Sequence, residues 1–252
     1  MYKIAAFAVL FAIHLALPAQ TAPPDPRFDV VSIKPNDSAD RRRSMSVTPR
    51  GGLRCIDYTL KDLIRLAWDA RDFQIRGGPK WLDADRYDIE ANPANPRQPY
   101  ADDPLRLRVM VQSMLAERFR LKLHSETRDE RVYFLTVGTH GTSLSPVGDA
   151  VDHTTSMRDS KGQMFATRID MPILARNLAA LVGAPVIDQT NLKGVYNIAL
   201  EWNADEVAPA ADSASAPSLF TALQQQLGLK LEPGRAPVEI LVVDEAGKAS
   251  AN

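Results

Sequence analysis

The predicted fold is decided by residues 59–91, which read TLKDLIRLAWDARDFQIRGGPKWLDADRYDIEA. Thr59 is suited to cap a helix, and apolar residues follow it at the i, i+3, i+4 and i+7 positions of one helical face. A short strand at 73–75, a glycine-rich turn at 77–79 and an alternating strand at 86–91 come next. The segment therefore predicts a unit of helix, strand, turn and strand.

The same order of elements is predicted three more times along the chain. The helices of these later units are expected at 107–115, 170–181 and 218–227. The paired strands that follow them are expected at 119–123 with 132–137, 186–187 with 196–202, and 229–231 with 238–243. In the last unit, Pro233 and Gly234 predict the turn between the strands. Four such units favour an α+β fold, with helices packed on antiparallel sheets, over alternating parallel strands.

Linkers rich in proline, glycine and small polar residues divide the chain into two predicted lobes. One helix with one hairpin is too small to bury its apolar face, so each lobe is expected to pair two units. The predicted divisions are a signal peptide at 1–19, a proline-rich lead at 20–27, an N-terminal lobe at 28–145, a polar loop at 146–162, a C-terminal lobe at 163–245 that contains a mobile linker at 203–217, and a tail at 246–252.

The amino terminus has the pattern of a secretory signal peptide. Lys3 precedes an apolar run at 4–17, and Pro18 and Ala19 supply the helix break and small residue expected near a cleavage site. The run is shorter than the roughly 20 residues of a comfortable bilayer span. We therefore expect cleavage near Ala19, no membrane span in the mature chain, and a periplasmic or secreted location. A retained membrane anchor is the alternative.

Composition and charge exclude several classes of function. The 252 residues include 30 basic and 31 acidic side chains, which give a formal net charge of -1. A chain without an overall positive field is not expected to bind nucleic acid. The single cysteine, Cys55, can form no internal disulfide and no cysteine-based zinc cluster, and it is best interpreted as a small buried apolar residue. The sequence predicts no cofactor and no metal.

Two surface segments are candidate binding sites. The first is the turn formed by Gly77, Gly78, Pro79, Lys80 and Trp81, which combines glycine flexibility with a rigid aromatic side chain. The second is the basic run Arg41, Arg42 and Arg43, which is suited to contact an anionic ligand or lipid headgroup. A solvated hairpin loop explains the basic run more simply.

Five stretches of the sequence carry a resemblance to a known family: 28–36 (FDVVSIKPN), 77–83 (GGPKWLD), 115–124 (LAERFRLKLH), 185–196 (PVIDQTNLKGVY) and 236–244 (APVEILVVD). They resemble a family of secreted bacterial proteins known as domain of unknown function 3738. The chain departs from the family at Asn191, where glycine is usual, at Asn197, where aspartate is usual, and after Asp244. Because asparagine tolerates a left-handed turn, Asn191 is not expected to change the fold.

The resemblance implies sensing or binding outside the cytoplasm, because some family members are fused to membrane sensor peptidases, and it supplies no catalytic residues. Residues 218–243 are also similar to the short amino-terminal module of secretins and TonB-dependent transducers. The leading prediction is therefore a non-enzymatic exported protein that binds a protein or cell-envelope partner and serves in sensing. The alternative is an extracytoplasmic hydrolase of glycan or peptide that uses paired carboxylates from Asp83, Asp85 and Asp88.

Overall fold

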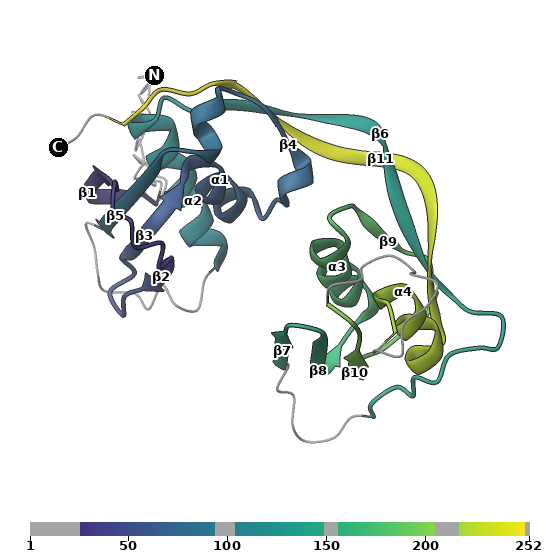
Figure 1. The fold of residues 1–252 in the computed structure, drawn as a ribbon. Helices are drawn as coiled ribbons and strands as arrows, with labels where there is room; N and C mark the ends of the chain where they lie inside the picture. The colour runs from purple at the N-terminus through teal and green to yellow at the C-terminus, as the bar shows by residue number, and fades with distance from the viewer. Residues whose placement is uncertain (1–25, 94–103, 149–155, 205–216, 250–252) are drawn as a thin grey trace, which may run out of the picture.

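The computed structural model describes residues 26–93, 104–148, 156–204 and 217–249 (Figure 1). The predicted signal peptide at 1–19 and most of the predicted linker at 203–217 lie outside these residues. The described chain has the α+β class that the sequence predicts, with mostly antiparallel sheets and separate helices. None of its described helices is both long and apolar enough to cross a membrane.

The first lobe is a four-stranded antiparallel sheet covered by two helices. The strands β1 (Phe28–Pro35), β2 (Ser44–Val47), β3 (Leu53–Thr59) and β5 (Arg86–Pro93) lie in the order β1-β5-β3-β2. The helices are α1 (Leu60–Trp68) and α2 (Pro104–Arg118). The predicted cap of α1 is confirmed, because the Thr59 hydroxyl accepts from the Asp62 N–H and the Asp62 carboxylate accepts from the Thr59 N–H, both at 3.1 Å.

The second lobe contains a three-stranded sheet and two helices. The strands β7 (Ser156–Ser160), β8 (Gln163–Ile169) and β10 (Tyr196–Glu201) lie in the order β10-β8-β7. The helices are α3 (Met171–Val182) and α4 (Leu219–Ala222), and α4 continues as the π-helical turn η4 (Leu223–Leu227). The sequence places a polar loop where β7 lies, because Met157 is the one large apolar residue in that strand.

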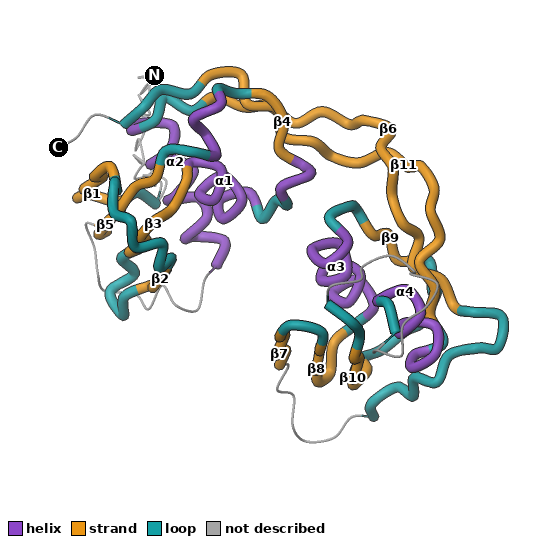
Figure 2. The backbone as a smooth tube through the Cα atoms, in the orientation of Figure 1, coloured by secondary structure: helices purple, strands orange, loops and turns teal. Residues whose placement is uncertain are grey.

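Two long antiparallel strands join the lobes (Figure 2). They are β6 (Lys122–Val137) and β11 (Leu229–Glu245), which pair with each other along nearly their whole length and are called the ribbon below. Two short strands, β4 (Ile75–Gly77) and β9 (Val186–Asp188), add to the outer edges of β11 and β6, and both run parallel to their neighbours. Two 3-10 turns, η1 (Asp72–Gln74) and η2 (Lys80–Asp83), flank β4.

The predicted local hairpins of the four helix-strand-strand units are wrong. Pro233 and Gly234 lie inside β11, opposite Tyr133 and Val132, so no turn forms there. The strands expected at 119–123 and 132–137 are likewise parts of one strand, β6. The strands after α1 and α3 exist, but β4 and β5 belong to different sheets, as do β9 and β10. The strands that follow each helix pair with distant segments instead of with each other.

The repeat that the fold contains is twofold. The order β2-β3-α1-β4-β5-α2-β6 is followed by β7-β8-α3-β9-β10-α4-β11, which has the same element types in the same sequence. Asp57 and Arg168 are both left-handed, with φ of 61° and 55°, and each precedes a helix N-cap by two residues. Their backbone N–H groups donate to equivalent side chains, Asp88 Oδ1 at 3.0 Å and Asn197 Oδ1 at 3.1 Å. The second half therefore repeats the first in detail.

Each ribbon strand begins in one hydrophobic core and ends in the other. Leu121, next to the start of β6, packs in the first core, whereas Leu135 packs in the second. Conversely, Leu229 at the start of β11 packs in the second core and Leu241 packs in the first. The boundary of the C-terminal lobe expected at residue 245 is thus misplaced, because the end of β11 completes the first lobe. The ribbon ties the two halves together by exchange of strands.

Candidate functional site

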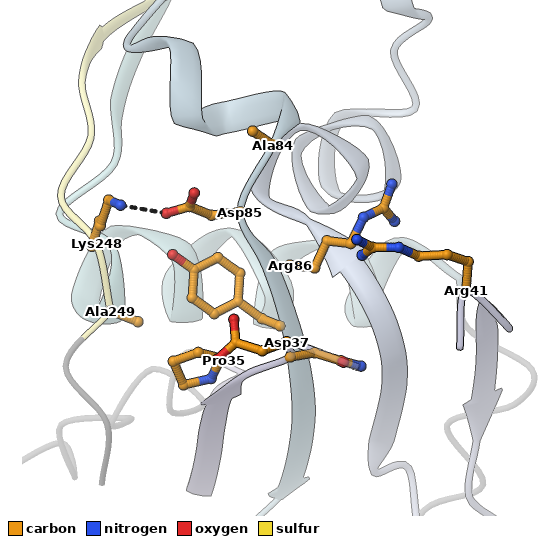
Figure 3. Close-up of a pocket in the computed structure, with 10 residues that line it drawn as sticks. Pro35, Asp37, Arg41, Ala84, Asp85, Arg86, Lys248 and Ala249 are labelled. Carbon is orange, nitrogen blue, oxygen red and sulfur yellow. Dashed lines mark ion pairs between the residues drawn. The ribbon is translucent and has the colours of Figure 1, made fainter. Parts of the chain in front are cut away.

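A cleft of about 480 Å³ opens on the first lobe beside the C-terminal segment of the chain (Figure 3). Its charged side chains are those of Asp37, Arg41, Asp85, Arg86 and Lys248. Figure 3 shows Arg41 and Arg86 on one side and the Lys248–Asp85 pair on the other. The cleft therefore offers groups of both charge signs to a ligand.

Asp57 lies behind the two arginines and is 1% exposed. The Arg86 Nη1 donates to Asp57 Oδ2 at 3.1 Å and to the Asp57 carbonyl oxygen at 3.2 Å. The Arg41 Nη1 lies 3.6 Å from Asp57 Oδ1, which accepts no hydrogen bond within the described parts of the chain. A buried carboxylate requires compensating charge, so Asp57 holds both guanidinium groups at the cleft wall.

The backbone of Asp57 is left-handed at φ 61°, a conformation that costs a non-glycine residue about 1 kcal/mol. The Asp88 side chain offsets this cost, because its Oδ1 accepts from the Asp57 N–H at 3.0 Å and from the Asn36 Nδ2 at 2.7 Å. The bulge between β3 and β5 at this point directs the Asp57 side chain toward Arg86. Asp88 thus acts as a structural acceptor beneath the cleft.

Lys248 closes the opposite side of the cleft. Its Nζ is 2.6 Å from Asp85 Oδ2 and 5.9 Å from the centre of the Trp81 ring. The sequence interpretation treats 246–252 as a divergent tail, and it gives no reason to place Lys248 beside Asp85. Contact between residues 163 positions apart follows only from the end of β11 packing on the first lobe.

The predicted turn site is held mainly by packing. Gly77 and Gly78 have φ of 73° and 75°, which favours glycine. A Cβ on Gly78 would collide with Leu82 and would press on Val243 at 3.1 Å. Gly78 therefore leaves room for the side chains of Leu82 and Val243. Lys80 and Trp81 begin η2, and Trp81 approaches the cleft through its contact with Lys248.

The three arginines of the predicted basic run have separate partners. Arg41 faces Asp57, as described above. Arg42 pairs at 2.7 Å with Asp40, and its side chain is 89% exposed. Arg43 pairs at 2.9 Å with Asp62 and lies 4.2 Å from the centre of the Tyr58 ring. The run is therefore not a single basic patch, and of the three only Arg41 lines this cleft.

The carboxylates named for a hydrolase do not act as a pair. Asp83 lies 3.4 Å from Lys61, Asp85 is paired with Lys248, and Asp88 accepts hydrogen bonds beneath the sheet. Of these three aspartates, Asp85 alone lines the cleft. Paired-carboxylate catalysis requires two carboxyl groups on opposite sides of one substrate. The arrangement of these side chains gives no such geometry.

The other candidate chemical groups are explained by packing or by ion pairs. Cys55 is fully buried, and burial raises the pKa of its thiol to about 12. His124 is exposed and contacts Asp244 at 2.9 Å between Nδ1 and Oδ2. Within the described ranges, no three His, Cys, Asp or Glu side chains are grouped to hold a metal ion.

The outer edge of β6 is a second candidate site. The Tyr133 N–H donates to the Pro185 carbonyl at 2.8 Å, and the Leu135 carbonyl accepts from the Gln189 N–H at 2.9 Å. The backbone N–H and C=O groups of odd-numbered residues in β6 therefore point away from β11. Strand alternation extends this orientation to residues 123, 125, 127, 129 and 131. The third strand, β9, pairs only with residues 133–135. In the described structure, β6 has no strand partner on this edge at residues 123–131.

The outer edge of β11 differs because two prolines interrupt it. Pro233 lies opposite Tyr133, and Pro237 lies opposite Asp129, so both prolines occupy outward-pointing positions. Neither can donate a backbone hydrogen bond, and proline is a common means of protecting a strand edge. The edge of β6 keeps all of its outward N–H groups over residues 123–131. Because Pro233 and Pro237 are an even number of residues apart in the sequence, they lie on the same edge of one strand, and this spacing could have indicated that the edge of β11 is protected.

Comparison with known proteins identifies a family. Residues 61–246 match the family model described as "Protein of unknown function (DUF3738)". No curated protein and no solved structure matches the chain. The match includes α1, the ribbon strand β6 and the second repeat, and it covers well over half of the 252 residues. The chain therefore belongs to the DUF3738 family.

Proposed function

We propose that this protein is exported to the cell envelope, where it binds a protein partner without catalysing a reaction. The observation that carries the proposal is the outer edge of β6, whose outward N–H groups at residues 123–131 lack a strand partner in the described structure. Among the outward carbonyls, that of Asp129 accepts from Arg235 Nη2 at 2.6 Å. Such an edge can accept an extended peptide as an additional strand. The proposed partner therefore contributes an extended segment that pairs with this edge.

The direction of the added strand is suggested by the ribbon itself. Both short strands on its edges, β4 and β9, are parallel to the strands that they contact. A partner segment parallel to β6 would lie on the same edge as β9, beside residues 123–131 and closer to the first lobe. The main-chain hydrogen bonds would supply affinity without dependence on the partner's side chains.

Specificity would come from a hollow at the first-lobe end of β6. This hollow measures about 500 Å³, and its apolar lining includes Trp68, Leu121 and Leu123. Trp68 ends α1 and is only partly buried, so its ring is available to a ligand. An apolar side chain of the added strand would fill the hollow, as pockets beside an edge strand do in other peptide-binding modules.

Export is supported by the sequence, through the charged residue, the apolar run and the small residues at 1–19. A sensing role is consistent with the family members that are fused to sensor peptidases. The hydrolase alternative has weaker support, because Asp83, Asp85 and Asp88 have separate partners. Binding is therefore the function that the arrangement favours.

The test compares two proline substitutions on opposite edges of the ribbon. Thr127→Pro removes an outward N–H from β6, whereas Arg235→Pro removes one from β11 between the two natural prolines. Because the Arg235 side chain also pairs with Asp129 on β6, Arg235→Ala serves as a further control for the loss of that contact. Each variant and the wild-type protein would be used to capture partners from an envelope extract, with circular dichroism as the check on folding. Hydrogen exchange of residues 123–131 would then be measured with the captured partner bound.

We expect Thr127→Pro to lose the partner and Arg235→Pro to retain it. The partner should also slow exchange of the odd-numbered amides between residues 123 and 131. Equal capture by both folded variants would exclude the β6 edge as the binding surface. Failure of the folded wild-type protein to capture any specific partner would contradict the proposed function as a whole.

A further inference from the structure

A second hollow, of about 190 Å³, lies beside α1 and is lined by three arginines, Arg43, Arg65 and Arg71. We call it the arginine hollow. Asp62 and Asp69 are the acidic residues of its lining, and Tyr58 contributes an aromatic wall. It is distinct from the cleft of Figure 3, with which it shares no lining residue. Its chemistry is therefore independent of the Asp57 site.

Most of the charges around the arginine hollow are paired. Asp62 lies 2.9 Å from Arg43 and 3.6 Å from Arg65. Asp69 lies 3.1 Å from Arg108 of α2 and 2.8 Å from Arg176 of α3. Asp72 adds a third carboxylate, 3.3 Å from Arg65 Nε. These four arginines already engage the three nearby carboxylates.

Arg71 is the fifth arginine of the group and has no carboxylate of its own. In the described structure, no carboxylate lies within ion-pair distance of its side chain, and its Nη2 donates only a long bond of 3.4 Å to the Arg176 carbonyl oxygen. Burial, followed by the nearby positive charge of Arg176, lowers the pKa of Arg71, and Asp69 only partly opposes this. Its guanidinium therefore lies in a region with surplus positive charge.

Arg65 adds positive charge to the hollow, which it lines beside Arg71. Its Nε is buried and makes no hydrogen bond to a described residue, because Asp72 at 3.3 Å is not aligned with the N–H. An anion in the hollow cannot contact an inaccessible atom, so Arg65 would attract it through charge and not through this donor. Arg71 thus supplies a cation without a carboxylate partner in the described structure, and Arg65 supplies a second positive charge.

We propose that the arginine hollow binds an oxyanion, that is, a phosphate, sulfate or carboxylate group, through Arg71 with Arg65 and Arg43 beside it. Guanidinium groups bind such anions through paired, charge-assisted hydrogen bonds. The volume is below the roughly 300–1,000 Å³ of sites for drug-sized ligands, so it suits one anionic group. The anion would balance the charge that the three carboxylates leave uncompensated.

The test uses inorganic phosphate as the probe and the full chain as the protein. Binding would be measured by calorimetry at constant ionic strength, with chloride as the competing salt. Arg71→Gln removes the unpaired cation, and Arg50→Gln is the matched control because Arg50 is an exposed turn residue that does not line the hollow. Circular dichroism and thermal unfolding without phosphate would establish that both variants are folded.

We expect saturable phosphate binding to weaken at least about tenfold in Arg71→Gln, a change typical of the loss of a charge-assisted contact, and to be unchanged in Arg50→Gln. Phosphate should also raise the unfolding temperature of the wild type and of Arg50→Gln, but not that of Arg71→Gln. Equal binding by both variants, or no saturable binding by the folded wild type, would overturn the proposal.

A second arm identifies the source of the anionic group. Vesicles of phosphatidylcholine with and without phosphatidylglycerol would compete with phosphate for the wild-type protein. Competition by the anionic vesicles alone would assign the group to a lipid headgroup, and absence of competition would assign it to a free oxyanion. Each result supports the site. The site does not depend on strand addition at β6, because no residue of β6 lines the arginine hollow.

Discussion

Arg86 covers the buried carboxylate of Asp57 from the cleft side, and its Nη1 donates to both the side-chain and the backbone oxygen of that residue, at 3.1 and 3.2 Å. The Arg86 side chain is 29% exposed and that of Asp57 is 1% exposed. The equivalent position in the second repeat is Arg168, and Val195 stands before Tyr196 where Arg86 stands before Tyr87 in the first repeat. The buried ion pair is therefore a feature of the first repeat alone.

The first prediction concerns Asp57→Asn. The amide keeps the shape of the side chain and tolerates the left-handed backbone, but it cannot balance the charges of Arg86 and Arg41. We expect the free energy of unfolding to fall by about 2 kcal/mol, since Arg86 would be left with a neutral partner. Urea denaturation followed by circular dichroism would measure the loss.

Asp37→Asn is the control for this prediction. Asp37 lines the same cleft but is exposed, and none of the residues that the structure describes forms an ion pair with it. Its replacement should change stability by less than about 0.5 kcal/mol. Similar losses in the two variants would mean that the cleft as a whole, and not the buried pair, carries the stability.

Cys55 provides a prediction about chemical reactivity. Its thiol is fully buried, and burial raises its pKa to about 12, so the reactive thiolate is scarce near neutral pH. We expect an excess of a thiol reagent to label the folded protein at the rate of unfolding and the urea-unfolded protein at once. Non-reducing electrophoresis should show no disulfide-linked dimer, and rapid labelling of the native protein would contradict the burial.

The same burial sets the sign of a pH effect on stability. The pKa of the Cys55 thiol is about 12 in the folded state and about 8.5 in the unfolded state. The contribution of the buried thiol to the free energy of unfolding is therefore complete below about pH 8.5 and decreases as the pH rises toward about 12. The free energy of unfolding of Cys55→Ser should decrease less than that of the wild type over this pH range, because serine does not ionise there. At neutral pH the variant should be less stable than the wild type, since a hydroxyl would replace a buried apolar group.

The elements of the fold that depend on local interactions could be predicted from the sequence. The helix α1 is an example, because Thr59 and Asp62 form its cap within three residues and the apolar spacing lies inside one helix. The ribbon could not be predicted in this way. Residues 124–131 of β6 are polar or charged on both faces, and they form a strand because β11, more than a hundred residues away, pairs with them.

The candidate site was predictable only in part for a related reason. Arg41 and Asp85 are visible in the sequence as charged residues near turns, and both line the cleft. Asp57 is indistinguishable from an ordinary polar residue at the start of a helix, since its burial follows from the bulge between β3 and β5. Lys248 and Arg71 likewise acquire their neighbours from packing of distant elements, for which the sequence contains no pattern.

His124 and Asp244 give a prediction for the first-lobe end of the ribbon. The hydrogen bond that the His124 Nδ1 donates to the Asp244 carboxylate, together with the negative charge of that carboxylate, raises the pKa of His124 above its ordinary value. The pair therefore stabilises the folded chain fully below pH about 6.5, and this contribution is lost as the pH rises through the raised value. A proton NMR titration should place the His124 pKa above that of an unperturbed histidine, and Asp244→Asn should return it to the ordinary range.

Two glycines with nearly the same backbone angle separate steric contact from conformational strain. Gly183 ends α3 at φ 65°, and a Cβ there would meet no atom within 4 Å. Gly228 ends η4 at φ 67°, and a Cβ there would collide with the carbonyl oxygen of Gly141. Gly183→Ala should therefore cost about 1 kcal/mol, which is the penalty of the left-handed conformation alone.

Gly228→Ala should cost about 3 kcal/mol, because the segment that contains Gly141 must also move away from the added methyl group. That segment is fixed to the end of η4, since the Gly138 N–H donates to the Gly228 carbonyl at 2.8 Å and the Ser143 N–H donates to the Leu227 carbonyl at 3.2 Å. Urea denaturation of the two variants measures the difference directly. Equal losses would show that the contact with Gly141 relaxes without cost, and that the left-handed backbone alone selects glycine at both helix ends.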